Sequence, residues 1–255
     1  MPDRLTLTAL DGFPLIGPGD DLASIIGDAI EKNEVMPKTG DIVVVAQKVV
    51  SKAEDRLVDL RNVTPGARAK ELARSVDKDP RHVEVILRES RSVIREKPGV
   101  LIVENNLGLI MANAGVDHSN VEADEPDEII LLLPEDPDAS AEKLRSTLSE
   151  RFGVEIGVII NDSVGRAWRI GTTGLAIGVA GLPAVVDLKG DKDLFGRELR
   201  VSEQAVADEL ASAASLLQGQ GAEGKPVVLI RGFTSYATVQ PATASLRPAD
   251  QDMFR

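Results

Sequence analysis

The sequence contains no cysteine and only two histidines, His82 and His118. The absence of cysteine excludes disulfide scaffolds, thiolate zinc sites, iron–sulfur clusters and a cysteine nucleophile. The two histidines are far apart in the chain, which argues against a metal site built from imidazoles. Any metal that this protein uses is therefore expected to have oxygen ligands.

Aromatic residues are also scarce, with one Trp, one Tyr and five Phe, so the core must consist mainly of Val, Ile, Leu and Ala. Acidic residues outnumber basic ones by 41 to 29, which gives a formal net charge of −12. This charge argues against nonspecific binding of nucleic acids or anionic membranes. No apolar run approaches the roughly 20 residues of a membrane-spanning helix, and the first residues do not resemble a signal peptide. We therefore expect a soluble, cytoplasmic protein.

The 255 residues fit one large domain or two small ones. Short apolar runs predict buried strands at 42–46, 100–103, 107–111, 129–133, 156–160, 184–188 and 227–230. Apolar residues at helical spacing predict helices at 20–33, 65–76, 80–95, 138–152 and 202–217. The strands and helices alternate without strict βαβ regularity. We therefore expect an α+β (mixed α/β) fold, with mixed sheets and flanking helices, rather than a doubly wound sheet.

Two polar segments directly follow predicted strands and contain candidate metal ligands. Asp162 and Ser163 follow the strand at 156–160, and Asp117 follows the strand at 107–111. Their oxygens suit magnesium or manganese. The alternative is an ordinary polar turn, which is equally compatible with the first segment and is the default for the second. His118 is adjacent to Asp117, and adjacent side chains usually diverge, so we expect His118 to be a bystander.

Two further segments suit an anionic ligand. Lys48 and Lys52 follow the strand at 42–46 in an otherwise acidic chain, although surface lysines are common. The Gly-rich loop 218–225 matches the start of a P-loop, but Pro226 replaces the expected Ser or Thr and the loop follows a helix instead of a strand. Its spacing favours a helix-capping turn, while backbone N–H groups there can still cradle phosphate. Together with hard-metal ligands, these are the features that a nucleoside triphosphate requires.

Taken in order, these segments are identifiable as a family pattern. The matching stretches are 12–16, 18–22, 40–54, 113–120, 133–138, 162–166, 192–199 and 227–232. On these stretches the chain resembles the coenzyme F420-0:L-glutamate ligase family, also called F420 gamma-glutamyl ligases. The resemblance spans about residues 5 to 255. It implies a single domain over 1–255, with two interleaved subdomains as a variant, and without the nitroreductase-like domain of some relatives.

The resemblance also implies an activity. Such enzymes use GTP to form a γ-glutamyl amide between L-glutamate and coenzyme F420-0, in the biosynthesis of coenzyme F420. An acyl phosphate is the implied intermediate and GDP the implied product. Mg²⁺ or Mn²⁺ is required and K⁺ assists. The resemblance further implies an intertwined homodimer. Two alternatives remain, namely a ligase of the same fold for another acid and amino acid, and a non-catalytic nucleotide-binding regulatory protein.

Carried over position by position, the resemblance implies specific site residues. The implied metal ligands are Asp117, Asp162, Ser163 and Gln220, and the implied catalytic residues are Asp162, Asp117 and Lys52. The implied GTP contacts are Phe13, Pro14, Leu15, Ile16, Gln47, Lys48, Lys52, Asn120, Gln218, Gly219, Gln220, Gly221, Ala222, Glu223, Gly224 and Lys225. Family members carry Glu where this chain has Gln220 and Thr where it has Ser163. An amide oxygen can still ligate a metal, but it brings no charge, for which Glu223 is a compensating candidate.

Overall fold

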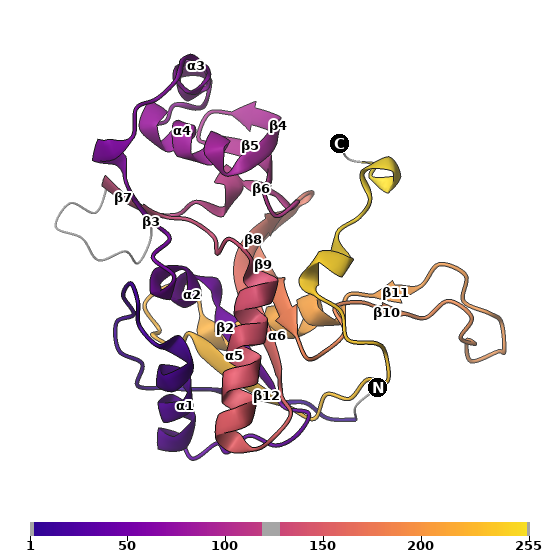
Figure 1. Ribbon diagram of the computed structural model, residues 1–255. Coiled ribbons are helices and arrows are strands. Elements are labelled where there is room, and N and C mark those ends of the chain that lie inside the picture. Colours follow the sequence, from indigo (N-terminus) through magenta and orange to yellow (C-terminus); the bar gives the residue numbers. More distant parts are fainter. Residues whose placement is uncertain (1–2, 119–127, 254–255) are drawn as a thin grey trace.

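The computed structural model describes residues 3–118 and 128–253 and shows an α+β architecture (Figure 1), which confirms the predicted fold class. Its centre is a mixed five-stranded sheet in the order β1-β12-β2-β8-β9. The strands are β1 (Thr6–Ala9), β2 (Ile42–Ala46), β8 (Gly157–Arg166), β9 (Arg169–Ala180) and β12 (Val227–Arg231). Strands β2 and β8 run parallel, and the other neighbours are antiparallel.

Helices cover both faces of this sheet, which explains why β2 is a continuous apolar run. Val43 and Val45 pack on the side of α1 (Leu22–Lys32), α2 (Gln47–Ala53) and α5 (Pro137–Phe152). Ile42 and Val44 pack on the side of α6 (Val206–Gln218). Because successive side chains of a strand point to opposite faces, a strand buried on both faces must be apolar at every position.

A second lobe is inserted between α2 and α5 and lies at the top of Figure 1. Its strands are β3 (Leu57–Asp59), β4 (Ser90–Lys97), β5 (Val100–Asn105), β6 (Ile110–Ala112) and β7 (Ile129–Leu131), and its helices are α3 (Ala67–Val76) and α4 (Pro80–Arg88). The antiparallel pair β3–β7 forms a stalk that connects the lobe to the central sheet. The lobe has its own apolar core around Leu72, Ile86 and Leu101.

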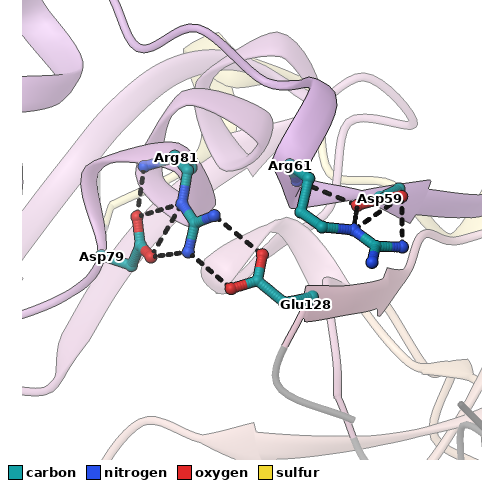
Figure 2. Close-up of polar contacts among 5 residues, drawn as sticks. All are labelled: Asp59, Arg61, Asp79, Arg81 and Glu128. Atoms are coloured by element: carbon teal, nitrogen blue, oxygen red, sulfur yellow. Dashed lines mark hydrogen bonds and ion pairs between the residues drawn. The ribbon is translucent and has the colours of Figure 1, made fainter. Parts of the chain in front are cut away.

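Ion pairs fix the lobe to its stalk. Figure 2 shows that Arg81, in the first turn of α4, contacts both Asp79 and Glu128, the residue before β7. The Arg81 guanidinium is 2.7 Å and 3.1 Å from the two carboxylate oxygens of Glu128. Next to it, Arg61 pairs with Asp59 at the end of β3. Paired, two-pronged contacts of this kind define geometry better than single ion pairs.

The rest of the chain forms a projecting hairpin and an irregular C-terminal segment. Strands β10 (Val186–Asp187) and β11 (Glu203–Gln204) begin the hairpin that extends away from the body in Figure 1. Short 3-10 turns at Leu60–Asn62, Asn113–Gly115, Ala242–Ser245 and Ala249–Gln251 complete the elements. Within the described residues, no helix is long and apolar enough to cross a membrane.

Two of the predicted helices need correction. The expected helix at 80–95 ends at Arg88, and the rest of that segment is strand β4, which pairs with β5. Val93 packs on the lobe core there, so tertiary pairing overrides a helical pattern. The expected helix at 202–217 begins only at Val206, because Glu203 and Gln204 pair with β10.

The predicted strands differ mainly in length. The run at 184–188 forms only a two-residue strand, β10, and the run at 107–111 enters strand β6 only at Ile110. The preceding residues form a turn because the Asn105 side chain accepts hydrogen bonds from the N–H groups of Leu107 and Leu109. Strands β5 and β6, which contain these two runs, are antiparallel neighbours.

The contact between β9 and α5 leaves no room for a side chain at Gly178. A β-carbon there would lie 2.2 Å from the carbonyl oxygen of Pro137 and 2.5 Å from its carbonyl carbon. Because both are backbone atoms, Gly178→Ala is expected to lower the free energy of unfolding by about 1–3 kcal/mol, measured by urea denaturation. Gly165→Ala is the matched control in the same hairpin, since a β-carbon there meets no atom within 4 Å. Equal losses in both variants would contradict this account.

Candidate functional site

The predicted site residues gather at the carboxyl ends of two parallel strands at the centre of the sheet. Strand β2 ends at Ala46, which pairs with Asn161 of β8. Strand β8 continues beyond this level with Asp162 and Ser163. The carboxyl ends of parallel strands meet at the same edge of a sheet, and ligands commonly bind there.

Helix α2 begins directly after β2 and brings two lysines to this edge. Lys48 lies in its first turn and Lys52 one turn later, on the same side of the helix. Gln47 is buried, and its amide nitrogen donates to Ser51 Oγ at 3.0 Å. This internal bond fixes the Gln47 side chain at the start of the helix.

Two carboxylates and a lysine form the charged part of the site. Lys48 Nζ lies 2.6 Å from Asp117 Oδ2. Asp117 is held by a two-way backbone bridge to Leu131 at the end of β7, with N···O distances of 3.0 and 2.8 Å. Burial raises the pKa of Asp162 to about 6; the N–H of Ser163 and the charge of Lys48 oppose this, and Asp117 adds to it. Lys48 and Asp117 are therefore near enough to Asp162 for their charges to act on its pKa.

On the opposite face of β8, Ser163 contacts the Gly-rich loop. Ser163 Oγ accepts a hydrogen bond of 2.9 Å from Gln220 Nε2. The oxygen of the same amide accepts from Thr172 of β9 at 3.4 Å. The structure therefore brings Ser163 and Gln220 together, but on the face of β8 opposite to Asp162, so the four implied metal ligands are divided between two faces. Thr172 could not be predicted from the sequence, because only its pairing with Gly165 in the β8–β9 hairpin brings it next to Gln220.

The N–H groups of the Gly-rich loop converge on a negative charge. The Glu223 carboxylate turns back and accepts from Gly221 N–H at 2.8 Å. The backbone N–H groups of Glu223 itself, Gly221 and Gln220 lower the pKa of this carboxyl. Gly219 has a φ of +75°, and a β-carbon there would lie 2.2 Å from the Glu223 side chain. The loop thus ends α6 and also forms a small anion-binding nest.

The segment 13–16 lies near both α2 and the loop. Lys225, at the end of the loop, is 3.4 Å from Asp11, just before this segment. On the other side, Gly19 N–H donates to the carbonyl of Ala53 at the end of α2, at 2.9 Å. Three of the predicted nucleotide-contacting regions are therefore adjacent in space.

His118 and Asn120 belong to the same polar segment as Asp117. His118 contacts His82 on α4, with 3.2 Å between Nε2 and Nδ1, and burial lowers the pKa of His82 to about 4. The two histidines, which are far apart in the chain, are therefore in contact in the fold. Asn120, a predicted nucleotide contact, lies outside the described residues.

The donor set fits a hard divalent cation. Across residues 3–118 and 128–253, no three His, Asp or Glu side chains gather in one group. The available ligands are instead two carboxylates, Asp117 and Asp162, with the neutral oxygens of Ser163 and Gln220. Mg²⁺ and similar ions are commonly held by one or two carboxylates together with waters and substrate phosphates. Burial is the main cause of the raised pKa of Asp162, and a bound cation would favour its charged form.

Comparison with known proteins identifies the family. The sequence model of the F420-0:Gamma-glutamyl ligase family matches residues 12–232. The chain belongs to this family. The match includes the site at the ends of β2 and β8, the inserted lobe and the Gly-rich loop. The resemblance stated from the sequence motifs is therefore confirmed.

Individual relatives match along nearly their whole length. The chain is 44% identical to the coenzyme F420:L-glutamate ligase of Methanothermobacter thermautotrophicus over 256 residues, which cover 98% of this chain and 99% of the relative. It is 46% identical to the protein of the same name from Methanopyrus kandleri, with coverage of 94% and 93%. For the Archaeoglobus fulgidus protein of that name the identity is 44%, with coverage of 90% and 88%.

Proposed function

We propose that this protein is a GTP-dependent ligase that joins the amine of L-glutamate to a carboxylate of coenzyme F420-0 through an amide bond. The observation that carries the proposal is the meeting of Lys48, Asp117 and Asp162 with the Ser163–Gln220 contact at one edge of the sheet. A cation-binding side and an anion-binding loop therefore lie together, as a metal-bound nucleoside triphosphate requires. The names of the relatives supply the substrates. Such a reaction takes place in the cytoplasm, where nucleotides are available.

The chemistry explains why a nucleotide is needed. An amine does not attack a carboxylate anion usefully, so the carboxylate must first acquire a leaving group. In the proposed reaction, an F420-0 carboxylate oxygen attacks the γ-phosphorus and GDP departs, which gives an acyl phosphate. The glutamate amine then attacks the acyl carbon, inorganic phosphate leaves, and the nitrogen loses a proton. A bound Mg²⁺ or Mn²⁺ would neutralise phosphate charge, and K⁺ is proposed as an assisting ion.

The chain's own groups have separate roles in this proposal. Lys48 and Lys52 attract the phosphates, and the N–H groups of the Gly-rich loop bind them after displacing the Glu223 carboxylate. Asp117 and Asp162 would hold the metal on one face of β8, while Ser163 and Gln220 would offer neutral oxygens from its other face. Gln220 Nε2 now faces Ser163, so its oxygen can reach a metal only after the amide turns.

The test is a mass-spectrometric assay with GTP, Mn²⁺, L-glutamate and F420-0. We expect a product heavier by one glutamyl residue, together with equal amounts of GDP and phosphate. Omitting L-glutamate should abolish the product. Phosphate release only with another acid and amino acid would favour a different ligase of this fold. GTP binding without any GDP would instead favour a regulatory protein.

Metal binding should weaken below about pH 6 if Asp162 is a ligand. Its raised pKa of about 6 means that the carboxyl is largely protonated below that pH, and a protonated carboxyl does not ligate a metal. The affinity for Mn²⁺ should fall by up to about tenfold per pH unit there. Electron paramagnetic resonance titration with Mn²⁺ between about pH 5 and 8 measures this. An affinity that stays constant over the range would exclude Asp162 as a ligand.

We also propose that the protein forms a homodimer through its projecting hairpins. Large apolar side chains are exposed at the β8–β9 tip, where Trp168 is 88% exposed, and in the β10–β11 hairpin, where Leu194 is 99% and Phe195 is 85% exposed. Such exposure is typical of interaction surfaces. Light scattering should show a dimer, and Phe195→Asp should shift it toward the monomer. A wild-type monomer at all concentrations would refute this.

A further inference from the structure

The side-chain amide of Gln218, the last residue of α6, forms hydrogen bonds within the protein through both its nitrogen and its oxygen. Its Nε2 donates to the carbonyls of Val44 at 3.3 Å and Pro226 at 3.0 Å. Its Oε1 accepts from Asn161 Nδ2 at 2.7 Å. Val44 lies on β2, Pro226 follows the Gly-rich loop, and Asn161 immediately precedes Asp162. One amide therefore joins both central strands and both ends of the loop.

The carbonyls determine how both amides are oriented. A backbone carbonyl only accepts hydrogen bonds, so the nitrogen of Gln218 must face Val44 and Pro226, and its oxygen must face Asn161. The Asn161 nitrogen then points to Gln218, and its buried oxygen has no hydrogen-bond partner among the described residues. A buried acceptor without a partner lowers stability. Stability alone therefore does not account for an asparagine at this position.

The loop is attached to β8 at two matched points. Asn161 and Ser163 are two residues apart and point to the same face of the strand, toward α6. Their partners, Gln218 and Gln220, are also two residues apart. Asp162, between them, points to the opposite face, toward Lys48. If the contact between Asn161 and Gln218 were lost, the loop would no longer be fixed against β8 at that point. Gln220 would then lose its position next to Ser163.

We infer that Asn161 and Gln218 are positioning residues that set the register of the Gly-rich loop against β8. This inference rests on the proposed function, in which the loop N–H groups and Gln220 meet the metal-bound phosphates. It assigns the Gln218 side chain to holding the loop rather than to contacting the nucleotide. Neither side chain touches the reacting atoms in this assignment.

The test combines a double-mutant cycle with two readouts. The variants are Asn161→Leu, Gln218→Met and the double variant, which keep similar side-chain volumes. Hydrogen exchange of the amides of 219–225 in the free protein should accelerate at least about tenfold in each variant. The Mn²⁺–GTP concentration for half-maximal turnover should rise about tenfold. Because Gln218→Met already removes the bond to Asn161, the double variant should resemble Gln218→Met rather than show the sum of the two single effects.

Ser212→Ala is the matched control on the same helix. Ser212 Oγ contacts Gly174 O at 2.8 Å and Thr173 Oγ1 at 2.9 Å, so its loss weakens the attachment of α6 to β9 without touching the loop. It should lower thermal stability but leave loop exchange and the Mn²⁺–GTP dependence unchanged. If Asn161→Leu does not fold, Asn161→Thr replaces it.

The outcomes separate the two proposals. Unchanged loop exchange, or additive effects in the double variant, would overturn the positioning role. The same holds if the variants lose only stability, as the control does. Hydrogen exchange of the loop is measured without substrates. A wild-type chain that makes no glutamyl product would therefore overturn the proposed function but not the positioning role of Asn161 and Gln218.

Discussion

Asp162→Asn is expected to reduce ligase turnover by at least about 10²–10³-fold while the protein remains folded. The substitution keeps the shape of the side chain but removes the charge that would bind the metal. Losses of this size are typical when one preorganised group that stabilises transition-state charge is removed. Turnover is measured as glutamyl product formed per enzyme at saturating Mn²⁺ and GTP. Wild-type turnover in this variant would refute a metal-binding role for Asp162.

The same substitution should raise the free energy of unfolding at neutral pH. Because the folded-state pKa is raised from the model-compound value of 3.8 to about 6, the charged carboxylate destabilises the folded protein above pH 6. This destabilisation develops between about pH 4 and 6 and is absent below that range. The destabilisation is at most about 3 kcal/mol. Contact of Asp162 with water makes it smaller than this limit.

Asp208→Asn is a control that separates these two effects. Burial also raises the pKa of Asp208, which accepts a hydrogen bond from Ala176 N–H at 3.0 Å, away from the proposed ligands. Its asparagine variant keeps an oxygen for this bond. It should gain stability without losing turnover. Lower stability in Asp162→Asn at pH 7, measured by urea denaturation in chelator, would contradict the origin assigned to the shifted pKa.

Arg231→Met is expected to produce the largest loss of stability, about 3–5 kcal/mol. Arg231 forms a two-pronged ion pair with Asp41, at 3.0 Å from Nε to Oδ1 and 2.6 Å from the terminal nitrogen to Oδ2. Asp41 is only 2% exposed. Removing the arginine leaves a buried carboxylate that keeps the N–H of Lys38 as a close donor, at 2.9 Å, but has no cation paired with it among the described residues. Urea denaturation at pH 7 measures the loss.

The double variant Asp41→Asn/Arg231→Met is the control for this prediction. It removes both charges, so it should lose much less stability than Arg231→Met alone. Additive losses in the double variant would show that the two side chains act independently.

The parts of the fold that could be predicted are those with a strong local pattern. Strands β2 and β12 and the first half of β8 are apolar on both faces, α1 has clear periodicity, and α5 has clear end signals in Pro137 and Gly153. Strand β9 could not be predicted, because residues 169–174 are largely exposed and pair only with the far half of β8. The turn between these strands uses a positive φ of 65° at Trp168, which sequence rules do not anticipate for tryptophan.

The separate segments of the candidate site could be predicted from the sequence, but the contacts between them could not. Lys48 and Asp162 both follow apolar runs, so each segment could be recognised alone. The contact between Lys48 and Asp117 depends on the bridge to Leu131 at the end of the inserted lobe, which no local pattern encodes. The contact between Asn161 and Gln218 depends in the same way on how α6 packs against β8. The residue roles implied by family resemblance therefore remain predictions for experiment.

The β3–β7 stalk has a consequence for the order in which the protein folds. Pairing of β2 with β8 must close a long stretch of chain, and the entropic cost of closure grows with its length. The stalk brings the two ends of the inserted lobe together, so a folded lobe leaves a much shorter stretch to close. The lobe should therefore form early and speed assembly of the central sheet. Since Asp117 lies at the end of the stalk and Asp162 on β8, the two carboxylates should come together only after the lobe and the central sheet have both formed, so incompletely folded chains should lack the proposed metal site.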